Sequence, residues 1–525
     1  MALIQVVVFL LLCSVVLGWL SRRAGVPYPI ALVVGGGVLS FIPGLPQLDI
    51  DPQFLLVLVL PPILYQAALL TSWRDFKGNI RFIGLLAIGL VIVTTLAVGA
   101  TLKFLIPDIP WAAAFVFGAI VSPPDAVAAT AILSRLNMPR RIVVVLEGES
   151  LVNDASGLVL YKLAVAAVLT GAFSFLDASA QFAVVSLGGI AVGVLGGLAF
   201  IWVHRQIGDA FTEVLVSLSI PYTLYVLAEA FHCSGVLAVV VAGLIRGRYT
   251  PVIVSAEMRI LARSVWNILV FILNSLIFVL IGMALSGVMG RLRGYSVTEL
   301  ITYAFWVSVV SIAVRFLWVY PATFVPRWLS PKLRAAEIPP QRGEVFIMSW
   351  CGMRGIVSLA AALALPLEVD SGDHFPYRDL LIFLTFVVIS VTLVVQGMTL
   401  TPLIRRLRLG TDPSQHQEHI RARGALGTAA LSAIDKAAKN EGMPRELVAR
   451  VRAEFIDRIG AAMPQGQNST FAHGRDLRLA AVRAERRELI RIWRAGEISD
   501  EVLHLLEEEL DYEEQRFQDP GVSAG

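Results

Sequence analysis

The ionisable side chains inside long apolar stretches carry the chemistry of this sequence. In VVVLEGESLVNDASGLVLYKLAVAA, Asp154 lies near the midpoint and Asn153 precedes it. A helix turns about 100° per residue, so Ser150 and Glu147 share a face with Asp154, whereas Glu149 points about 140° away. A charge at the centre of a bilayer costs at least about 2.5–3.5 kcal/mol. A carboxylate there predicts binding of a cation or a proton rather than helix packing alone.

A second signal is the double proline in AIVSPPDAVAATAIL. Pro123 and Pro124 have no N–H, so the carbonyls of Ala119 and Ile120 lose their helical donors. A helix broken in the middle of a membrane is tolerated where it lines a cavity, and its freed carbonyls can coordinate a cation. Asp125 follows directly, at the start of the second half-helix, where the helix dipole favours a negative charge.

The third signal is Arg354, in the middle of VFIMSWCGMRGIVSLAAALALP. Arginine stays charged at any relevant pH, so Arg354 needs a carboxylate or carbonyl dipoles nearby. Gly352 and Gly355 flank it and allow an unwound backbone. Glu149 and Asp125 are candidate partners, and both a structural ion pair and a direct role in transport remain open.

The elements that position these residues are membrane-spanning helices. Of the 525 residues, 56% are hydrophobic and 16% are charged, against about 25% charged in an ordinary soluble domain. A span needs roughly 20 apolar residues, and multiple spans predict an all-α helix bundle. Thirteen segments qualify: 3–20, 28–44, 53–70, 82–106, 111–133, 143–169, 180–203, 213–231, 234–246, 265–287, 298–325, 344–366 and 379–403.

Charge divides the chain into two parts. Residues 410–525 hold 36 of the 83 charged residues, which predicts a transmembrane domain over 1–409 and a helical cytoplasmic domain over 410–525. Basic residues in the loops favour one side of the spans by twenty to four, so that side is expected to be cytoplasmic and the N-terminus outside. We interpret the first apolar run as a retained span rather than a signal peptide.

The interruptions fall in the fifth and the twelfth spans, seven places apart. Broken helices at matching places in two halves of opposite topology are typical of inverted-repeat transporters. No HExxH zinc site, phosphate-binding loop, CxxC pair or cofactor motif is present in the sequence, so we expect neither an enzyme nor a cofactor nor a nucleic-acid partner. An aspartyl protease dyad of Asp125 and Asp154 is a weaker hypothesis, because it leaves Arg354 unexplained.

The motifs VSPPDAVAATAI, LEGESLVNDASGLVLY and WCGMRGIVSLAAALALP resemble those of the monovalent cation:proton antiporters, the sodium/proton exchangers, in their bacterial branch. The resemblance covers about residues 1–410. It implies thirteen helices in two inverted repeats, with crossed and partly unwound helices in the core. It also implies a homodimer.

The same resemblance implies roles for individual residues. Asp154 is similar to the family's cation- and proton-binding carboxylate, Asn153 to the residue that replaces a second aspartate of electrogenic relatives, and Ser150 to a side-chain ligand. Asp125 is similar to the acid of the broken helix, and Glu149 and Arg354 to a pair that braces the core.

Two positions depart from the family pattern. Many relatives have threonine where Pro124 stands, and its hydroxyl helps the ion site. Many also have an acid where this chain has Gln66, which can offer only a neutral oxygen. The site is therefore expected to be poorer in charge and hydroxyls, with Glu147 and Gln66 as accessory groups.

We therefore expect secondary antiport of Na⁺ or Li⁺ against H⁺ in the inner membrane, electroneutral and serving pH and sodium homeostasis. In this mechanism a proton and a partly dehydrated Na⁺ compete for Asp154. K⁺/H⁺ exchange on the same scaffold is one alternative. A channel or anion carrier that uses Arg354 is another.

Overall fold

The computed structural model describes most of residues 2–460, together with scattered residues between 484 and 512. Within 2–460 the gaps are residues 25, 43–51, 134–135, 137, 172–173, 255, 293, 332–340, 371, 408, 410–412 and 442–443. The chain divides into two compact units, Met1–Gly410 and Thr411–Gly525. Each unit is described by itself.

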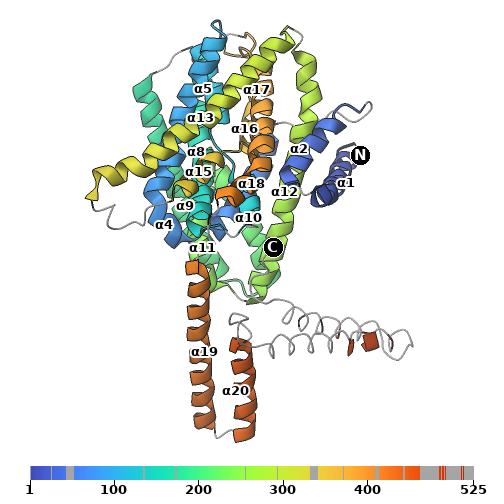
Figure 1. The fold of residues 1–525 in the computed structure, drawn as a ribbon, viewed down its shortest axis with the longest axis vertical. Coiled ribbons are helices and arrows are strands. Elements are labelled where there is room, and N and C mark those ends of the chain that lie inside the picture. The colour runs from blue at the N-terminus through green and yellow to red at the C-terminus, as the bar shows by residue number, and fades with distance from the viewer. Residues whose placement is uncertain are drawn as a thin grey trace. The chain divides into compact units, whose positions relative to one another are not determined.

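The first unit is helical, and each of the thirteen predicted segments contains helix (Figure 1). The prediction of an all-α polytopic fold is therefore confirmed. Among the described residues, seven helical stretches are long and apolar enough to cross a membrane, and shorter apolar helices accompany them. The uninterrupted helices are α1 (Ala2–Ala24), α2 (Tyr28–Leu39), α3 (Pro52–Leu70), α8 (Arg140–Thr170), α9 (Phe175–His204), α10 (Ala210–Ala230), α11 (Gly235–Ile253), α12 (Ala256–Arg291) and α13 (Val297–Leu329).

Both predicted helix breaks are present. The fifth segment forms α6 (Trp111–Val121) and α7 (Ala126–Leu133), separated by Ser122–Asp125. The twelfth forms α15 (Arg342–Trp350) and α16 (Ile356–Leu363), separated by the irregular segment Cys351–Gly355. Proline removes donors in the first break, and glycine on either side of Arg354 permits the second.

Two further helices contain a wider, π-helical turn. The fourth segment runs through α4 (Trp73–Gly84), the π-helical η1 (Leu85–Leu90) and α5 (Val91–Leu105). The last runs through α17 (Arg378–Val391), the π-helical η3 (Thr392–Gln396) and α18 (Gly397–Leu407). Short π-helical turns inside α-helices are rare and occur often at functional sites.

The fourth helix also begins earlier than predicted. It starts at Trp73 rather than residue 82, and the Ser72 side chain accepts a hydrogen bond from the N–H of Asp75 at its N-terminus. This first turn is polar and amphipathic, so a search for apolar length alone cannot find it.

Glycines allow several helices to approach closely. On α9, Gly189, Gly193 and Gly197 recur every four residues, and α11 packs along this stripe. A Cβ at Gly193 would lie 2.6 Å from the carbonyl oxygen of Ala238. Small residues at this spacing are a common way for membrane helices to associate, because they let two backbones come together.

The second unit contains two described helices, α19 (Pro413–Glu441) and α20 (Arg445–Gly460). They lie side by side (Figure 1), and Arg452 pairs with Asp435 at 3.1 Å across them. Both helices agree with the expectation that residues 410–525 are helical. His473 and His504 lie outside the described residues. So does most of the segment 475–516, which is rich in arginine at its start and in acidic residues at its end.

Candidate ion-binding site

The two helix breaks meet at Asp125. Its backbone N–H donates a hydrogen bond of 2.7 Å to the carbonyl of Met353, in the unwound segment of the other broken helix. Its carboxylate accepts a 2.8 Å hydrogen bond from the N–H of Val127, in the first turn of α7, and another from the N–H of Ile356, the first residue of α16. Asp125 therefore links both half-helices through backbone groups.

Helix dipoles stabilise a negative charge at this position. The carboxylate of Asp125 faces the N-terminal ends of α7 and α16, each of which carries a partial positive charge. Gly355 makes this contact possible, since a Cβ there would overlap the Asp125 carboxylate. The prediction that Asp125 lies at the N-terminal end of a half-helix is correct, and the structure adds a second helix end.

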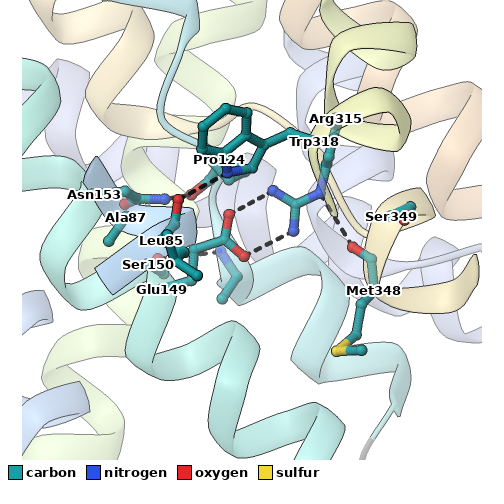
Figure 2. A network of polar contacts seen from close by, with 12 residues as sticks. Leu85, Ala87, Pro124, Glu149, Ser150, Asn153, Arg315, Trp318, Met348 and Ser349 are labelled. Atoms are coloured by element: carbon teal, nitrogen blue, oxygen red, sulfur yellow. Dashed lines mark hydrogen bonds and ion pairs between the residues drawn. The ribbon is translucent and has the colours of Figure 1, made fainter. Parts of the chain in front are cut away.

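The α8 motif lies against the same break. Asp154 is 6% exposed, and Asn153 is fully buried. The Asn153 amide donates a 2.9 Å hydrogen bond to the carbonyl of Pro124 (Figure 2), while its oxygen Oδ1 is buried with no hydrogen-bond partner among the described residues. Asp154 and Asp125 are close enough to repel each other electrostatically. The site thus gathers two acids and an unpaired amide oxygen.

Ser150 lies one turn from Asp154, as the helical spacing predicts. Its hydroxyl oxygen accepts a 3.3 Å hydrogen bond from the N–H of Ala126 at the start of α7. Glu147, one turn further, is partly exposed. The hydroxyl of Ser150 therefore joins α8 to the broken helix and keeps its own hydrogen available for another acceptor.

The carbonyl of Pro124 is not an open ligand position in this structure, because Asn153 donates to it. Of the two carbonyls that the prolines were expected to free, that of Ala119 accepts a 3.0 Å hydrogen bond from the hydroxyl of Ser122. The hydroxyl of Ser122 thus replaces one backbone donor that proline removes, and the amide of Asn153 binds a carbonyl exposed by the break itself. The carbonyl oxygen of Pro124 could bind a cation only through its second lone pair, because the first accepts the hydrogen bond from Asn153.

The expected pair of Glu149 and Arg354 is wrong in its partner. Glu149 pairs with Arg315 of α13 through two parallel hydrogen bonds, 2.5 Å from Nη1 to Oε1 and 2.8 Å from Nη2 to Oε2 (Figure 2). Both side chains are 1% exposed. Arg315 Nε also donates to the carbonyl of Met348 at 3.1 Å, so this guanidinium joins α8, α13 and α15. Helical spacing correctly predicted that Glu149 points away from Asp154. It cannot predict which of two arginines on other helices binds Glu149.

Arg354 is instead held by neutral groups. Its Nη1 donates to the carbonyl of Gly352 and its Nη2 to the hydroxyl of Ser311, each at 3.0 Å. Its backbone N–H donates to Thr392, at the start of η3, at 3.1 Å. Ser311 and Arg315 are one turn apart on α13, so that helix holds both guanidinium groups. Arg354 still interacts with the Glu149 charge at longer range.

Gln66 faces a different neighbour from the one expected of an accessory ion ligand. Its amide nitrogen donates a 3.1 Å hydrogen bond to Asn267 of α12. No described contact joins Gln66 to Asp154. Elsewhere on α8, Lys162 forms an ion pair with Glu229 of α10 at 2.8 Å.

The motifs of the sequence analysis do not include two groups of residues that hold the site in place. Arg315 lies inside an apolar segment, as Arg354 does, and the cost of burying its charge is the signal that it needs a buried acid. The other group supports η1, where Trp318 donates to the carbonyl of Leu85 at 2.9 Å and Ser156 donates to that of Ala87. Nothing in the local sequence distinguishes Ser156 from an ordinary helix-packing serine.

Comparison with known proteins shows which family the chain belongs to. Residues 7–406 match the model of the transmembrane domain described as sodium/hydrogen exchanger. The chain belongs to the sodium/hydrogen exchanger family. An uncharacterized Na⁺/H⁺ exchanger of Mycobacterium tuberculosis is 35% identical over 527 residues, covering 98% of this chain and 96% of that protein.

Two further relatives extend the comparison. A sodium, potassium, lithium and rubidium/H⁺ antiporter of Bacillus subtilis is 32% identical over 510 residues, covering 94% of this chain and 75% of that protein. The solved sodium proton antiporter MjNhaP1 of Methanocaldococcus jannaschii matches in fold, with a TM-score of 0.62 and 19% identity over 78% of this chain and 99% of that one. This family member is therefore a multi-pass membrane antiporter of monovalent cations and protons.

Proposed function

We propose that the chain exchanges Na⁺ or Li⁺ for H⁺ at Asp154, with one proton exchanged for each cation. The observation that carries this proposal is the position of Asp154, buried in the middle of α8 beside the break between α6 and α7. A bare carboxylate there pays a desolvation cost, which binding of either a proton or a cation relieves. Because the two cannot bind the same oxygens together, release of one accompanies binding of the other.

Oxygen atoms around Asp154 suit a small hard cation. The unpaired Oδ1 of Asn153, the hydroxyl of Ser150 and the carboxylate itself are hard ligands, and water can complete the shell. Asn153 holds the break in place through Pro124 while offering its oxygen to the site. We propose Asp154, Asn153 and Ser150 as the cation ligands. Glu147 lies on the path by which the cation reaches them.

The charge balance supports an electroneutral cycle. Glu149 is neutralised by Arg315, and the charge of Asp125 is balanced by two helix N-termini. Asp154 is then the group that changes its partner during the cycle, so each turnover moves one positive charge in each direction. Exchange is expected to be insensitive to membrane potential.

The test uses proteoliposomes of the full chain with an entrapped pH indicator. We expect an imposed Na⁺ or Li⁺ gradient to drive proton movement in the wild type and in Glu299→Gln, which removes an exposed acid outside the site. We expect Asp154→Asn to lose the activity. Activity of Asp154→Asn near the wild-type level would overturn the proposal, and a rate that follows a K⁺/valinomycin potential would overturn electroneutrality.

K⁺/H⁺ exchange is the alternative that one observation favours. Gln66 binds Asn267 rather than the site, and Pro124 supplies no hydroxyl, so the ligand set is less charged and less polar than expected for strong Na⁺ selection. The Bacillus subtilis relative is named as an antiporter of both sodium and potassium. Comparing Na⁺, Li⁺ and K⁺ gradients in the same vesicles decides between them. An anion carrier gains no support, since both Nη atoms of Arg354 donate to neutral groups.

The remaining features of the proposal concern the setting. We infer a cytoplasmic-membrane protein with its N-terminus outside and residues 410–525 inside, acting as a homodimer in pH and sodium homeostasis. The loop charges support the orientation, and labelling of single cysteines from either side of the membrane would test it. Cross-linking in native membranes would test the dimer.

A further inference from the structure

An open cavity of about 840 Å³ lies in the first unit, away from Asp154. It is formed where the end of α3, the start of α4 and the C-terminal part of α11 come together. Its lining includes Leu69, Leu70, Arg74, Lys77, Gly247 and Arg248. The exchange mechanism uses none of these residues.

Close packing of two helices brings the basic residues of this cavity together. Gly243 and Gly247 of α11 lie against α3, and a Cβ at Gly243 would be 2.7 Å from the Cβ of Ala68. At Gly247 a Cβ would overlap the carbonyl of Leu69. Arg248 follows directly and is thereby placed at the end of α3, where the chain turns into α4.

The cavity is positively charged. Arg74 and Lys77 are three residues apart on α4 and so share a face, and both are exposed, as is Arg248. No acid is among the described lining residues. The neighbouring Asp75 pairs with Arg140 at 2.6 Å. The first turn of α4 adds N–H groups without intrahelical acceptors and the positive end of its dipole.

Apolar groups form the other part of the lining. Leu70 is 66% exposed, and Trp73 lies beside it at the start of α4. Tryptophan at a helix end is typical of the membrane–water interface. An apolar edge next to three cations fits a ligand that carries both a phosphate and a hydrocarbon chain.

We propose that this cavity binds the phosphate headgroup of an anionic phospholipid, with Arg74, Lys77 and Arg248 as its ligands. Leu70 and Trp73 contact the first part of the acyl region. Basic pockets between membrane helices bind such headgroups because each cation near the surface adds favourable interaction with anionic lipid. The proposal is independent of the ion chemistry at Asp154.

The test titrates the purified full chain with phosphatidylglycerol or phosphatidylcholine and counts bound lipid by native mass spectrometry. For the tightest site of the wild type we expect a preference for phosphatidylglycerol of about tenfold or more. The variant Arg74→Gln/Lys77→Gln/Arg248→Gln should lose this preference. Arg248→Gln alone should weaken it about threefold.

A matched triple variant controls for total charge. Arg22→Gln/Arg205→Gln/Arg263→Gln removes three exposed cations elsewhere and should keep the preference. An unchanged preference in the cavity variant, or an equal loss in the control, would overturn the proposal. So would displacement of the lipid by millimolar inorganic phosphate, because the cavity would then select free phosphate rather than a lipid.

Discussion

The carboxylate of Glu149 and the guanidinium of Arg315 form a buried pair with two parallel hydrogen bonds, although 166 residues separate them in the chain. Removing one partner of such a pair leaves an uncompensated buried charge, which costs about 3–5 kcal/mol. We expect Arg315→Met or Glu149→Gln to lower the free energy of unfolding by that amount, measured by denaturation of the purified protein.

A double variant distinguishes this ion pair from simple packing. Glu149→Leu/Arg315→Met should recover most of the loss, because no charge remains unpaired. The exposed pair of Lys162 and Glu229 is the matched control, and Lys162→Met should cost about 0–1 kcal/mol. Single variants at the buried pair that are no less stable than Lys162→Met would contradict the prediction.

The crossing of the two broken helices depends on the missing side chain of Gly355. Gly355→Ala would place a methyl group into the Asp125 carboxylate, so the half-helices must separate. We expect loss of cation-driven proton movement and a lower melting temperature. Gly84→Ala is the control, because a Cβ there meets nothing within 4 Å. Equal activity and equal melting temperature of the two alanine variants would contradict the prediction, because the half-helices would then not need to lie so close together.

Asp125 should be needed more for its hydrogen bonds than for its exchangeable proton. Asp125→Asn keeps an oxygen that accepts from the N–H of Val127, whereas Asp125→Ala leaves that donor unpaired. We expect the alanine variant to be less stable than the asparagine variant by about 1 kcal/mol. Unfolding of the two variants in the same denaturant series measures this difference. If alanine is as stable as asparagine, the contact contributes nothing.

The side-chain amides of Asn153 and Gln66 should differ in their effect on cation affinity. Asn153→Ala removes both the donor to Pro124 and the unpaired oxygen, so we expect the cation KM to rise about tenfold or more, the equivalent of about 1.4 kcal/mol. Gln66→Ala should change KM by less than about twofold, because Gln66 contacts Asn267. Initial rates over a range of Na⁺ concentrations measure both KM values. A larger increase of KM in Gln66→Ala would show that Gln66 contributes to cation binding.

Local rules were sufficient for much of the architecture. Each of the thirteen segments chosen for apolar length contains helix, proline chemistry located the break before Asp125, and glycines around a buried arginine located the break at Arg354. Helical periodicity also correctly predicted that Ser150 shares a helix face with Asp154 and that Glu149 does not. These features depend on residues that are neighbours in the chain, so spacing and hydrogen-bonding capacity determine them.

Partner choice was decided only by the tertiary structure. The cost of a buried charge shows that Glu149 and Arg354 each need a partner, but it does not say that α13 presents Arg315 to the first and Ser311 to the second. The contact of Asp125 with the N-terminus of α16 likewise depends on how two broken helices cross. Such pairings follow from packing between segments far apart in sequence, where distance and shape choose among several chemically equivalent groups.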